Sequence, residues 1–484
     1  MQQTRSLSTT QSLLLLVTAW EALLVVLLSP LSATGPLAGL GLAARLGLDE
    51  AGRVGRIVML YHSLAVPFVA ALVYLILDAL PFEPRIPQAV RPAITAGYLL
   101  TSGGGLSFAY LRAGWIAHGI FLVGLSLTFY AGVVLWWGLS PWRPVRSEPR
   151  NEAEWRPVRS EPRSEAEWRP DGTPLRSVPD YEPSLRGIQA VRSEPRSEAE
   201  WRPALRWAFW LMALYTLISA VIGGATGAYF GNGFQAFLAE DVLRAEHDLF
   251  QRAIIAHLHI MLTLIDVALL LLIAQRVGLA GRAYRAAVPL IIAGTTITAF
   301  ATWSVMVVEK IAHRIINVGA VVLLAGAAIV ALYGMRGLIR ERRDRPALWA
   351  LLSDPVRFGM LFHLLFVNLV VTVPGVWVAL NLEAVRAGDP AWERAFAVGH
   401  WHVLATLSAA VGLLLVVDRL GTRGWRRQLV GWGVLAGSTL AFAAVQFYMF
   451  RQPGLAPARA VLLAIDAGIG LFLLALALFV LGRR

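Results

Sequence analysis

The amino-acid sequence predicts an all-α, polytopic membrane protein, and three observations lead to this fold class. The chain has 484 residues, of which 57% are hydrophobic and 15% are charged, whereas about a quarter of the residues in ordinary soluble domains are charged. Apolar runs of about 20 residues recur along the whole chain, and such runs are long enough to cross a bilayer as helices. The sequence also lacks cysteine, which excludes disulfide frameworks, thiolate metal sites, iron–sulfur clusters and cysteine nucleophiles.

Twelve apolar runs predict twelve transmembrane helices. The first run is expected to be a span and not a cleavable signal peptide, because it is long and has no clear small-residue cleavage motif. The predicted spans are 12–34, 58–80, 92–111, 115–137, 206–228, 253–275, 287–308, 312–335, 358–381, 396–417, 428–449 and 460–482.

A polar insert divides this membrane domain in sequence, at residues 142–203. The 13-residue segment RPVRSEPRNEAEW (143–155) is followed by RPVRSEPRSEAEW (156–168), and a third copy ends at Trp201. A repeat so rich in Pro, Glu and Arg cannot bury enough apolar surface to fold, so we expect a disordered cytoplasmic loop without a role in chemistry. Residues 1–141 then carry spans one to four, and residues 204–484 carry spans five to twelve.

The net charge of +12 is interpreted as a topology signal and not as a nucleic-acid patch. Arginines gather in the short loops near 276–285, 336–345 and 419–427, all on one side of the predicted membrane. By the positive-inside rule that side is cytoplasmic, which places both termini there. The expected location is the cytoplasmic membrane of a bacterium or archaeon.

Seven histidines are predicted to share one depth in the outer part of the membrane. They fall within about the first two turns of the even-numbered spans two, four, six, eight and ten; they are His62, His118, His257, His259, His313, His400 and His402. A single histidine in a span is often only hydrogen-bonded to a neighbouring helix. Seven in one layer indicate a function, because neutral imidazole is a common ligand for haem iron, copper and zinc.

Two of these spans carry a His-x-His pattern, in AHLHIMLTL (256–264) and GHWHVLATL (399–407). Residues two apart on a helix point about 200° apart, so each pair presents its rings to opposite sides and one helix could serve two cofactors.

An internal repeat accompanies the histidines. IAHGIFLVG (116–124) matches IAHRIINVG (311–319) at an offset of 195 residues, and the same offset relates His62 to His257. Together with the step of 143 residues from His257 to His400, this predicts three successive four-helix blocks, each with a histidine early in its second helix. Repeats of spans are also found in transporters, so the repeat alone selects no function.

Twelve spans, a histidine in span two and His-x-His in span ten resemble subunit I of the haem-copper oxidase superfamily, which includes the nitric oxide reductases. The stretch VPGVWVALNLEAVRAGDPAWERAFAVGHWHV (373–403) is similar to the connection between spans nine and ten of the B-type oxidases, and YHSLAVPF (61–68) is similar to the span-two haem-ligand region. The resemblance implies two haems, of b type, with His62 and His402 as axial ligands of a low-spin haem and His400 as proximal ligand of a high-spin haem.

The sequence departs from that family at the second metal of the active site, which is copper in oxidases and non-haem iron in reductases. The segment TTITAFATWSVMVV (295–308) lacks the family's His-His pair, and Met261 stands where the family has Tyr or Glu. A substitute site could use His257 or His259 with Glu309 and His313, which are i, i+4 neighbours on one helix. Glu309 could equally be an interfacial residue beside Lys310, without any metal.

The leading hypothesis is therefore a respiratory redox protein that passes electrons between two haems and reduces a small gas, O2 or NO, with its catalytic residues unassigned. A separate cytochrome c-type or cupredoxin subunit, or a quinol, would donate the electrons, because the chain has no haem-attachment cysteine. Two alternatives stay open: a non-catalytic membrane cytochrome b for electron transfer, and a twelve-span transporter with a histidine-lined path.

Overall fold

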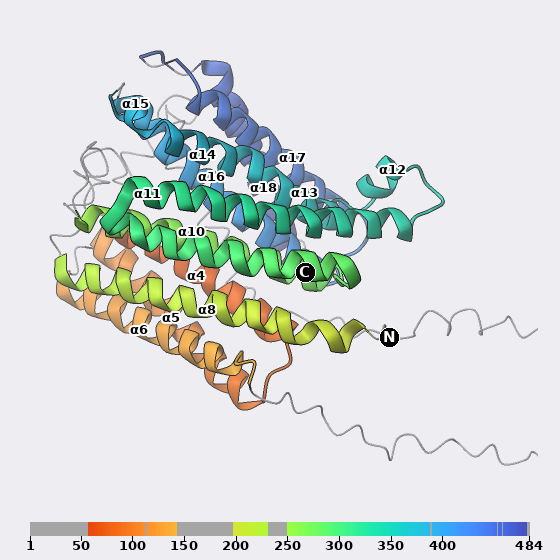
Figure 1. Ribbon diagram of the computed structural model, residues 1–484, viewed down its shortest axis with the longest axis horizontal. Helices are drawn as coiled ribbons and strands as arrows, with labels where there is room; N and C mark the ends of the chain where they lie inside the picture. Colours follow the sequence, from red (N-terminus) through yellow and green to blue (C-terminus); the bar gives the residue numbers. More distant parts are fainter. Residues whose placement is uncertain are drawn as a thin grey trace, which may run out of the picture.

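The computed structural model describes residues 57–111, 114–142, 197–230, 249–387, 390–452, 454–456 and 458–481. Within these ranges all regular elements are helices, which lie side by side in an elongated bundle (Figure 1). The predicted span 12–34 and nearly all of the polar insert fall outside the described residues. The described part of the insert includes its last seven residues, which form the start of helix α8 at Ser197, although a disordered loop to residue 203 was expected.

Each predicted span from 58–80 onward coincides with a helical segment. The long helices are α4 (Ile57–Ala79), α5 (Arg85–Leu111), α6 (Gly114–Gly138), α8 (Ser197–Phe230), α10 (Leu249–Arg276), α11 (Gly281–Glu341), α16 (Pro390–Arg419), α17 (Gly424–Met449) and α18 (Arg459–Leu481). Span nine is divided into α13 (Pro355–Val367), the π-helical segment η4 (Asn368–Thr372) and α14 (Val373–Leu380); the short helices are α12 (Ala347–Leu352) and α15 (Leu382–Ala387).

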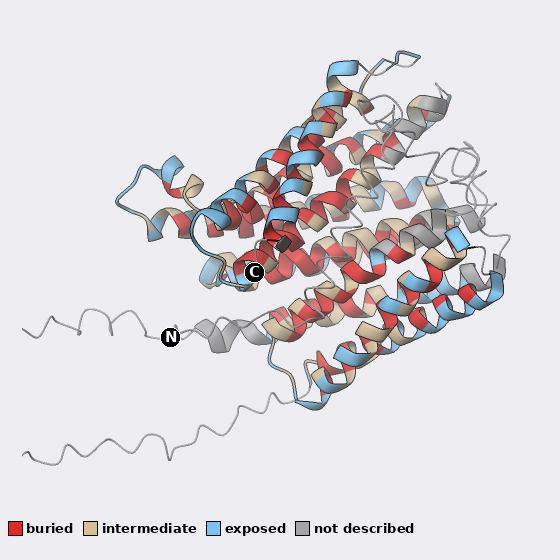
Figure 2. Ribbon diagram, turned by 180° about the vertical axis from the view of Figure 1, so that it is seen from behind, coloured by how far each residue is buried: buried red, intermediate tan, exposed pale blue. Residues whose placement is uncertain are grey.

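The described residues contain eight helices that are long and apolar enough to cross a membrane. Large apolar side chains stay exposed along the outside of the bundle, among them Ile116 (77% exposed) and Leu369 (64%). Figure 2 shows the matching pattern, with buried residues on the inner faces of the helices and exposed ones outside. An apolar exterior around a packed interior suits a multi-pass protein in a lipid bilayer.

Helix α11 is one of these eight, yet it accounts for two predicted spans, because it folds back on itself. Its backbone leaves helical geometry at Val308 (φ −131°, ψ 60°). A Cβ added to Gly294 would lie 2.5 Å from the backbone nitrogen of Leu323, and one added to Gly326 would lie 2.8 Å from a side-chain carbon of Ile291. In a straight helix, Gly294 and Leu323 would be about 43 Å apart. The two limbs are therefore antiparallel, with the turn at Val308.

Glycine contacts of the same kind join α5 to α6 and α17 to α18. A Cβ on Gly104 would lie 2.5 Å from the nitrogen of Phe121, and one on Gly437 would lie 2.5 Å from the carbonyl oxygen of Gly468. Small residues at such positions let helix backbones approach closely inside a membrane.

The three hairpins repeat one contact pattern. In each hairpin, a glycine on the first limb is followed four residues later by Thr or Ala, and this second residue faces a glycine of the other limb. The three sets are Gly97–Thr101–Gly124, Gly294–Thr298–Gly319 and Gly437–Ala441–Gly468. A threefold repeat predicts this recurrence. The complete set of twelve helices in four-helix blocks stays a prediction, since the predicted span 12–34 lies outside the described residues.

Helices α4, α10 and α16 meet at the centre of the bundle, where each contacts the other two. Their inward faces belong to one continuous core that includes Leu72, Leu271 and Leu414. These are the second helices of the three predicted blocks, and each begins at the same end of the bundle, which we call the histidine end.

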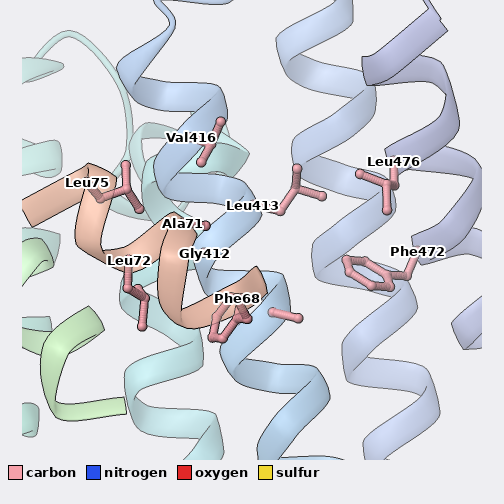
Figure 3. Close-up of a pocket in the computed structure, with 10 residues that line it drawn as sticks. Phe68, Ala71, Leu72, Leu75, Gly412, Leu413, Val416, Phe472 and Leu476 are labelled. Atoms are coloured by element: carbon pink, nitrogen blue, oxygen red, sulfur yellow. The ribbon is translucent and has the colours of Figure 1, made fainter. Parts of the chain in front are cut away.

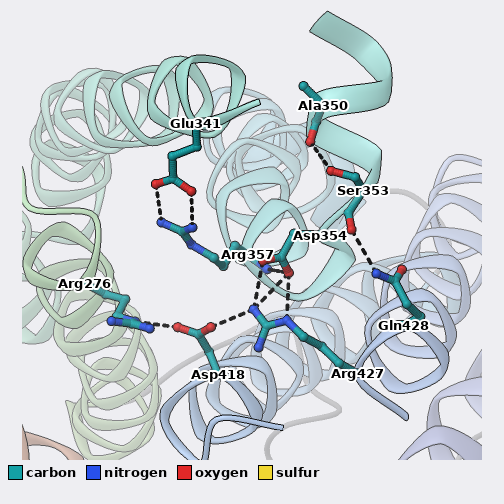
Figure 4. Close-up of polar contacts among 9 residues, drawn as sticks. All are labelled: Arg276, Glu341, Ala350, Ser353, Asp354, Arg357, Asp418, Arg427 and Gln428. Atoms are coloured by element: carbon teal, nitrogen blue, oxygen red, sulfur yellow. Dashed lines mark hydrogen bonds and ion pairs between the residues drawn. The ribbon is translucent and has the colours of Figure 1, made fainter. Parts of the chain in front are cut away.

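The opposite end, called here the arginine end, is closed by a network of ion pairs (Figure 4). Asp418 accepts from Arg276 at 2.5 Å and from Arg427 at 2.7 Å, and Arg427 also binds Asp354. Arg357 donates to both oxygens of Glu341, at 2.6 and 3.1 Å. Because these groups come from α10, α11, α13, α16 and α17, the network ties five helices together at the end that the sequence predicts to be cytoplasmic.

Candidate functional site: the histidine layer

His62 on α4 and His257 on α10 lie against each other near the starts of their helices. Their ring centres are 6.3 Å apart and the ring planes differ by 16°. This contact joins the first and second predicted blocks.

The orientation of His257 is set by α8. The Nδ1 of His257 lies 2.7 Å from the carbonyl oxygen of Ser219, and since a carbonyl can only accept, Nδ1 carries the proton. A Cβ on Gly223 would lie 2.6 Å from the same nitrogen, so the ring occupies space that glycine leaves open. The neutral ring then presents the lone pair of Nε2, which is the arrangement that metal-binding histidines adopt.

His259 on α10 and His400 on α16 form a second pair, with ring centres 5.6 Å apart and planes at 37°. The His400 ring packs against Gly375 of α14, where an added Cβ would lie 2.7 Å from a ring carbon. The Nδ1 atom of His400 is buried and has no hydrogen-bond partner. The two imidazoles of the His-x-His pattern on α10 thus face different neighbours, α4 and α16, as their spacing predicts.

Both separations suit two imidazoles that share one metal ion. With metal–nitrogen distances of about 2 Å, two such rings place their centres about 5 Å apart at a tetrahedral angle and about 6.4 Å apart when the two nitrogens are opposite each other. The pair His259–His400 falls inside this range, and the pair His62–His257 lies at its upper limit, where the two nitrogens stand nearly opposite each other.

The remaining histidines occupy other surroundings. His118 contacts Phe108, Trp115 and Phe121, and Phe121 also meets the edge of His62. His402 and His313 are partly buried on α16 and on the second limb of α11. Both ring nitrogens of His363 have hydrogen-bond partners within the protein: one lies 2.6 Å from the Gly359 carbonyl oxygen and the other 2.6 Å from the Ser438 hydroxyl oxygen.

The substitute metal site suggested by the sequence is not gathered into one cluster. Glu309 lies at the α11 turn and faces Arg252 at 3.6 Å, while His257 and His259 point to different helices. Among the residues that the structure describes, no group of three His, Asp or Glu side chains could hold a metal ion. Each close histidine pair offers two nitrogen donors, which is fewer than the three protein ligands typical of catalytic zinc.

A small apolar cavity lies between α4, α16 and α18 (Figure 3). Its lining residues Phe68 and Gly412 follow His62 and His402 along their helices by six and ten residues. Its volume is about 30 Å³, and its lining includes Phe68, Gly412 and Phe472. Ligand pockets usually measure about 300–1,000 Å³. The donor chemistry of the histidine layer fits haem iron, but this cavity is far smaller than a macrocycle, so a haem between α4 and α16 requires these helices to separate.

Ser219, Gly223 and Gly375 support the histidines and were not singled out in the sequence. Serine and glycine are common in membrane helices, so their presence alone gives no signal. Gly375 belongs to the PG of the stretch 373–403, and that motif was the available hint.

No family model matches the chain, and no curated protein or solved structure matches it.

Proposed function

We propose that the chain is a membrane-embedded redox protein that binds haem through the histidine layer, similar in plan to the catalytic subunit of a haem-copper oxidase or nitric oxide reductase. The observation that carries the proposal is the meeting of four imidazoles from three central helices, as the pairs His62–His257 and His259–His400. Placing ionisable rings inside a membrane is costly, so their convergence argues for a bound group.

The repeat supports His62 and His402 as one ligand pair. At the interface of α10 and α16, His259 faces His400. The offsets of 195 and 143 residues relate His62 to His257 and His257 to His400, so His62 occupies the same position in its block as His400. The offset of 143 residues likewise relates His259 to His402. If the contact between His259 and His400 recurs at the interface of α16 and α4, the corresponding residues are His402 and His62. This is the pairing that the family resemblance implies.

The chain's own residues would hold and orient the group. His62 and His402 supply two axial nitrogens, and His400, whose Nδ1 has no hydrogen-bond partner, supplies a third. Haem, when bound, provides the redox chemistry and an open iron position for O2 or NO. The surrounding apolar helices exclude bulk water, and an external cytochrome c-type, cupredoxin or quinol donor would deliver the electrons.

The first test is the reduced-minus-oxidised spectrum of the purified protein, in which we expect a b-type signal. His402→Ala should abolish the low-spin signal, whereas His400→Ala should spare it and remove CO binding. His363→Gln is the matched control, because His363 is bonded to Ser438 and Gly359 and should leave both signals unchanged. A colourless preparation, or identical spectra for the two alanine variants, contradicts the proposal.

A non-catalytic cytochrome b is the second candidate. It is favoured by the finding that no three-ligand metal group occurs among the described residues. Metal analysis for copper and non-haem iron, together with CO binding to the reduced protein, separates the two candidates. A second metal and CO binding support the catalytic form, and haem without either supports the cytochrome.

A further inference from the structure

Helices α10 and α16 are joined by three polar contacts spaced along their length. His259 meets His400 at the histidine end, and Arg276 meets Asp418 at the arginine end. Between them, Asp266 of α10 meets Ser408 of α16, with the carboxyl oxygen 2.5 Å from the hydroxyl oxygen. At 1.5 Å per residue, Asp266 lies about 10 Å from the level of His259 and about 15 Å from that of Arg276.

Asp266 occupies the interior of the bundle. From Leu264 to Ala274, α10 is buried at every position except Asp266, which keeps part of its surface accessible. The carboxyl therefore lies in a closely packed stretch of the bundle.

The hydrogen bonds of Ser408 indicate the protonation state of Asp266. The Ser408 hydroxyl oxygen lies 2.5 Å from Asp266 Oδ1 and 2.8 Å from the carbonyl oxygen of Leu404. A serine hydroxyl has one proton to donate, while a carbonyl and a carboxylate only accept. Both contacts are satisfied when Asp266 is a neutral acid that donates to Ser408, and Ser408 in turn donates to Leu404. The positions of hydrogens are inferred from such networks.

No basic side chain within the described ranges forms an ion pair with Asp266. The titratable groups of neighbouring helices bond elsewhere: Tyr74 of α4 with Thr95, Tyr215 of α8 with Thr296, and His363 of α13 with Ser438. On α10 and α16 themselves, the charged Arg276 and Asp418 bind each other, and the nearest histidine level is that of His259. An unpaired carboxylate in this interior would carry a large desolvation cost, which protonation removes.

We propose that Asp266, with Ser408, is a reversible proton-binding site in the middle of the bundle, between the histidine layer and the arginine end. Its ligand is a single proton, and the repeat argues against a metal cation. The positions that correspond to Asp266 in the repeat are Ala71 on α4 and Ala409 on α16, which are both apolar, so the repeat supplies no matching carboxylate or hydroxyl ligand from these two helices. The proposal goes beyond the haem function and does not depend on it.

The test is infrared difference spectroscopy of the purified, full-length protein without added haem. We expect the wild type to show the carbonyl-stretch band of a protonated carboxyl that shifts in D2O, and Asp266→Asn to lose one such component. Asp344→Asn is the matched control: its exposed carboxyl lies beside Arg345, so this variant should lose carboxylate intensity alone. Ser408→Ala should move the Asp266 band to higher frequency, because the carboxyl loses its hydrogen-bond partner.

Several outcomes would overturn the proposal. One is an Asp266→Asn variant that loses carboxylate bands instead of the protonated-acid component. Another is a wild-type band that disappears when Na⁺ replaces K⁺ at constant pH, which would identify a cation site. If Asp266→Asn does not fold, the frequency shift in Ser408→Ala decides alone, and an unshifted band refutes the site. Because the test compares infrared bands of carboxyl groups between the wild type and the Asp266 and Ser408 variants, these results are independent of the visible spectra that test haem binding.

Discussion

The close approach of the helix hairpins can be tested with two adjacent glycines of α5. A Cβ on Gly104 would lie 2.5 Å from the backbone nitrogen of Phe121 and 2.8 Å from the carbonyl oxygen of Ala117, whereas a Cβ on Gly103 would meet nothing within 4 Å. Both residues lie inside the same helix, so their intrinsic helix preferences are alike. The pair therefore isolates the effect of packing.

The expected magnitude follows from these contacts. Gly104→Ala forces a carbon against backbone atoms that cannot rotate away, and such overpacking costs about 1–3 kcal/mol. Gly103→Ala gains about 0.5–1 kcal/mol, because alanine loses less conformational entropy than glycine in a helix. The free energies of unfolding of the two variants should therefore differ by about 1.5–4 kcal/mol, with Gly104→Ala the less stable.

Thermal unfolding of the detergent-solubilised protein, followed by tryptophan fluorescence, measures the difference. Gly103→Ala should melt at or above the wild-type temperature, and Gly104→Ala several degrees below it. The same contrast is expected on α18, where a Cβ on Gly468 would lie 2.5 Å from the nitrogen of Ala441 and Gly470 faces open space. Equal melting temperatures for Gly103→Ala and Gly104→Ala would refute the packing of the α5–α6 hairpin.

Two further predictions concern orientation and the arginine end. In the cysteine-free chain, a single cysteine in Lys310→Cys, at the turn of α11, should react with an impermeant maleimide added to intact cells, while Asp344→Cys should react only after lysis; the reverse pattern would invert the predicted topology. Asp418→Ala should destabilise the protein by about 2–4 kcal/mol, because it leaves Arg427 (15% exposed) with Asp354 as its only partner and removes a hydrogen bond from the half-exposed Arg276. The control Asp344→Ala, from an exposed ion pair, should change stability by less than about 0.5 kcal/mol. Equal effects of the two variants in chemical unfolding would argue against the network.

Most of the helical layout could be predicted from the sequence, because long apolar runs leave few structures other than helices in a membrane. The runs 287–308 and 312–335 were separated correctly, although only Val308 departs from helical geometry between them. The start of α8 at Ser197 was missed, since the polar repeat there carries no apolar periodicity. The division of span nine by the π-helical segment Asn368–Thr372 also left no signal, because its residues are ordinary for a membrane helix.

The sequence could predict the candidate site only where the geometry of a single helix determines the direction of a side chain. The opposite directions of His257 and His259 follow from helical geometry, and the structure confirms them. The choice of neighbour does not follow in this way, because it depends on the rotation and spacing of packed helices. The sequence led us to expect His62 beside His402, and the structure places His62 beside His257; the pairing with His402 stays a prediction.

The three hairpins, α5–α6, α11 and α17–α18, differ from the central helices α4, α10 and α16 in how similar the copies of the repeat are. The hairpins keep a glycine at matching positions of all three copies, which is what close packing requires at Gly124, Gly319 and Gly468. The central helices, in contrast, differ among the copies: α4 has one histidine near its start, while α10 and α16 have two, and the positions that correspond to Asp266 are Ala71 on α4 and Ala409 on α16. Packing alone would not produce such differences at positions that face the same core. Hairpin substitutions should therefore lower stability without altering the properties of the histidines on α4, α10 and α16.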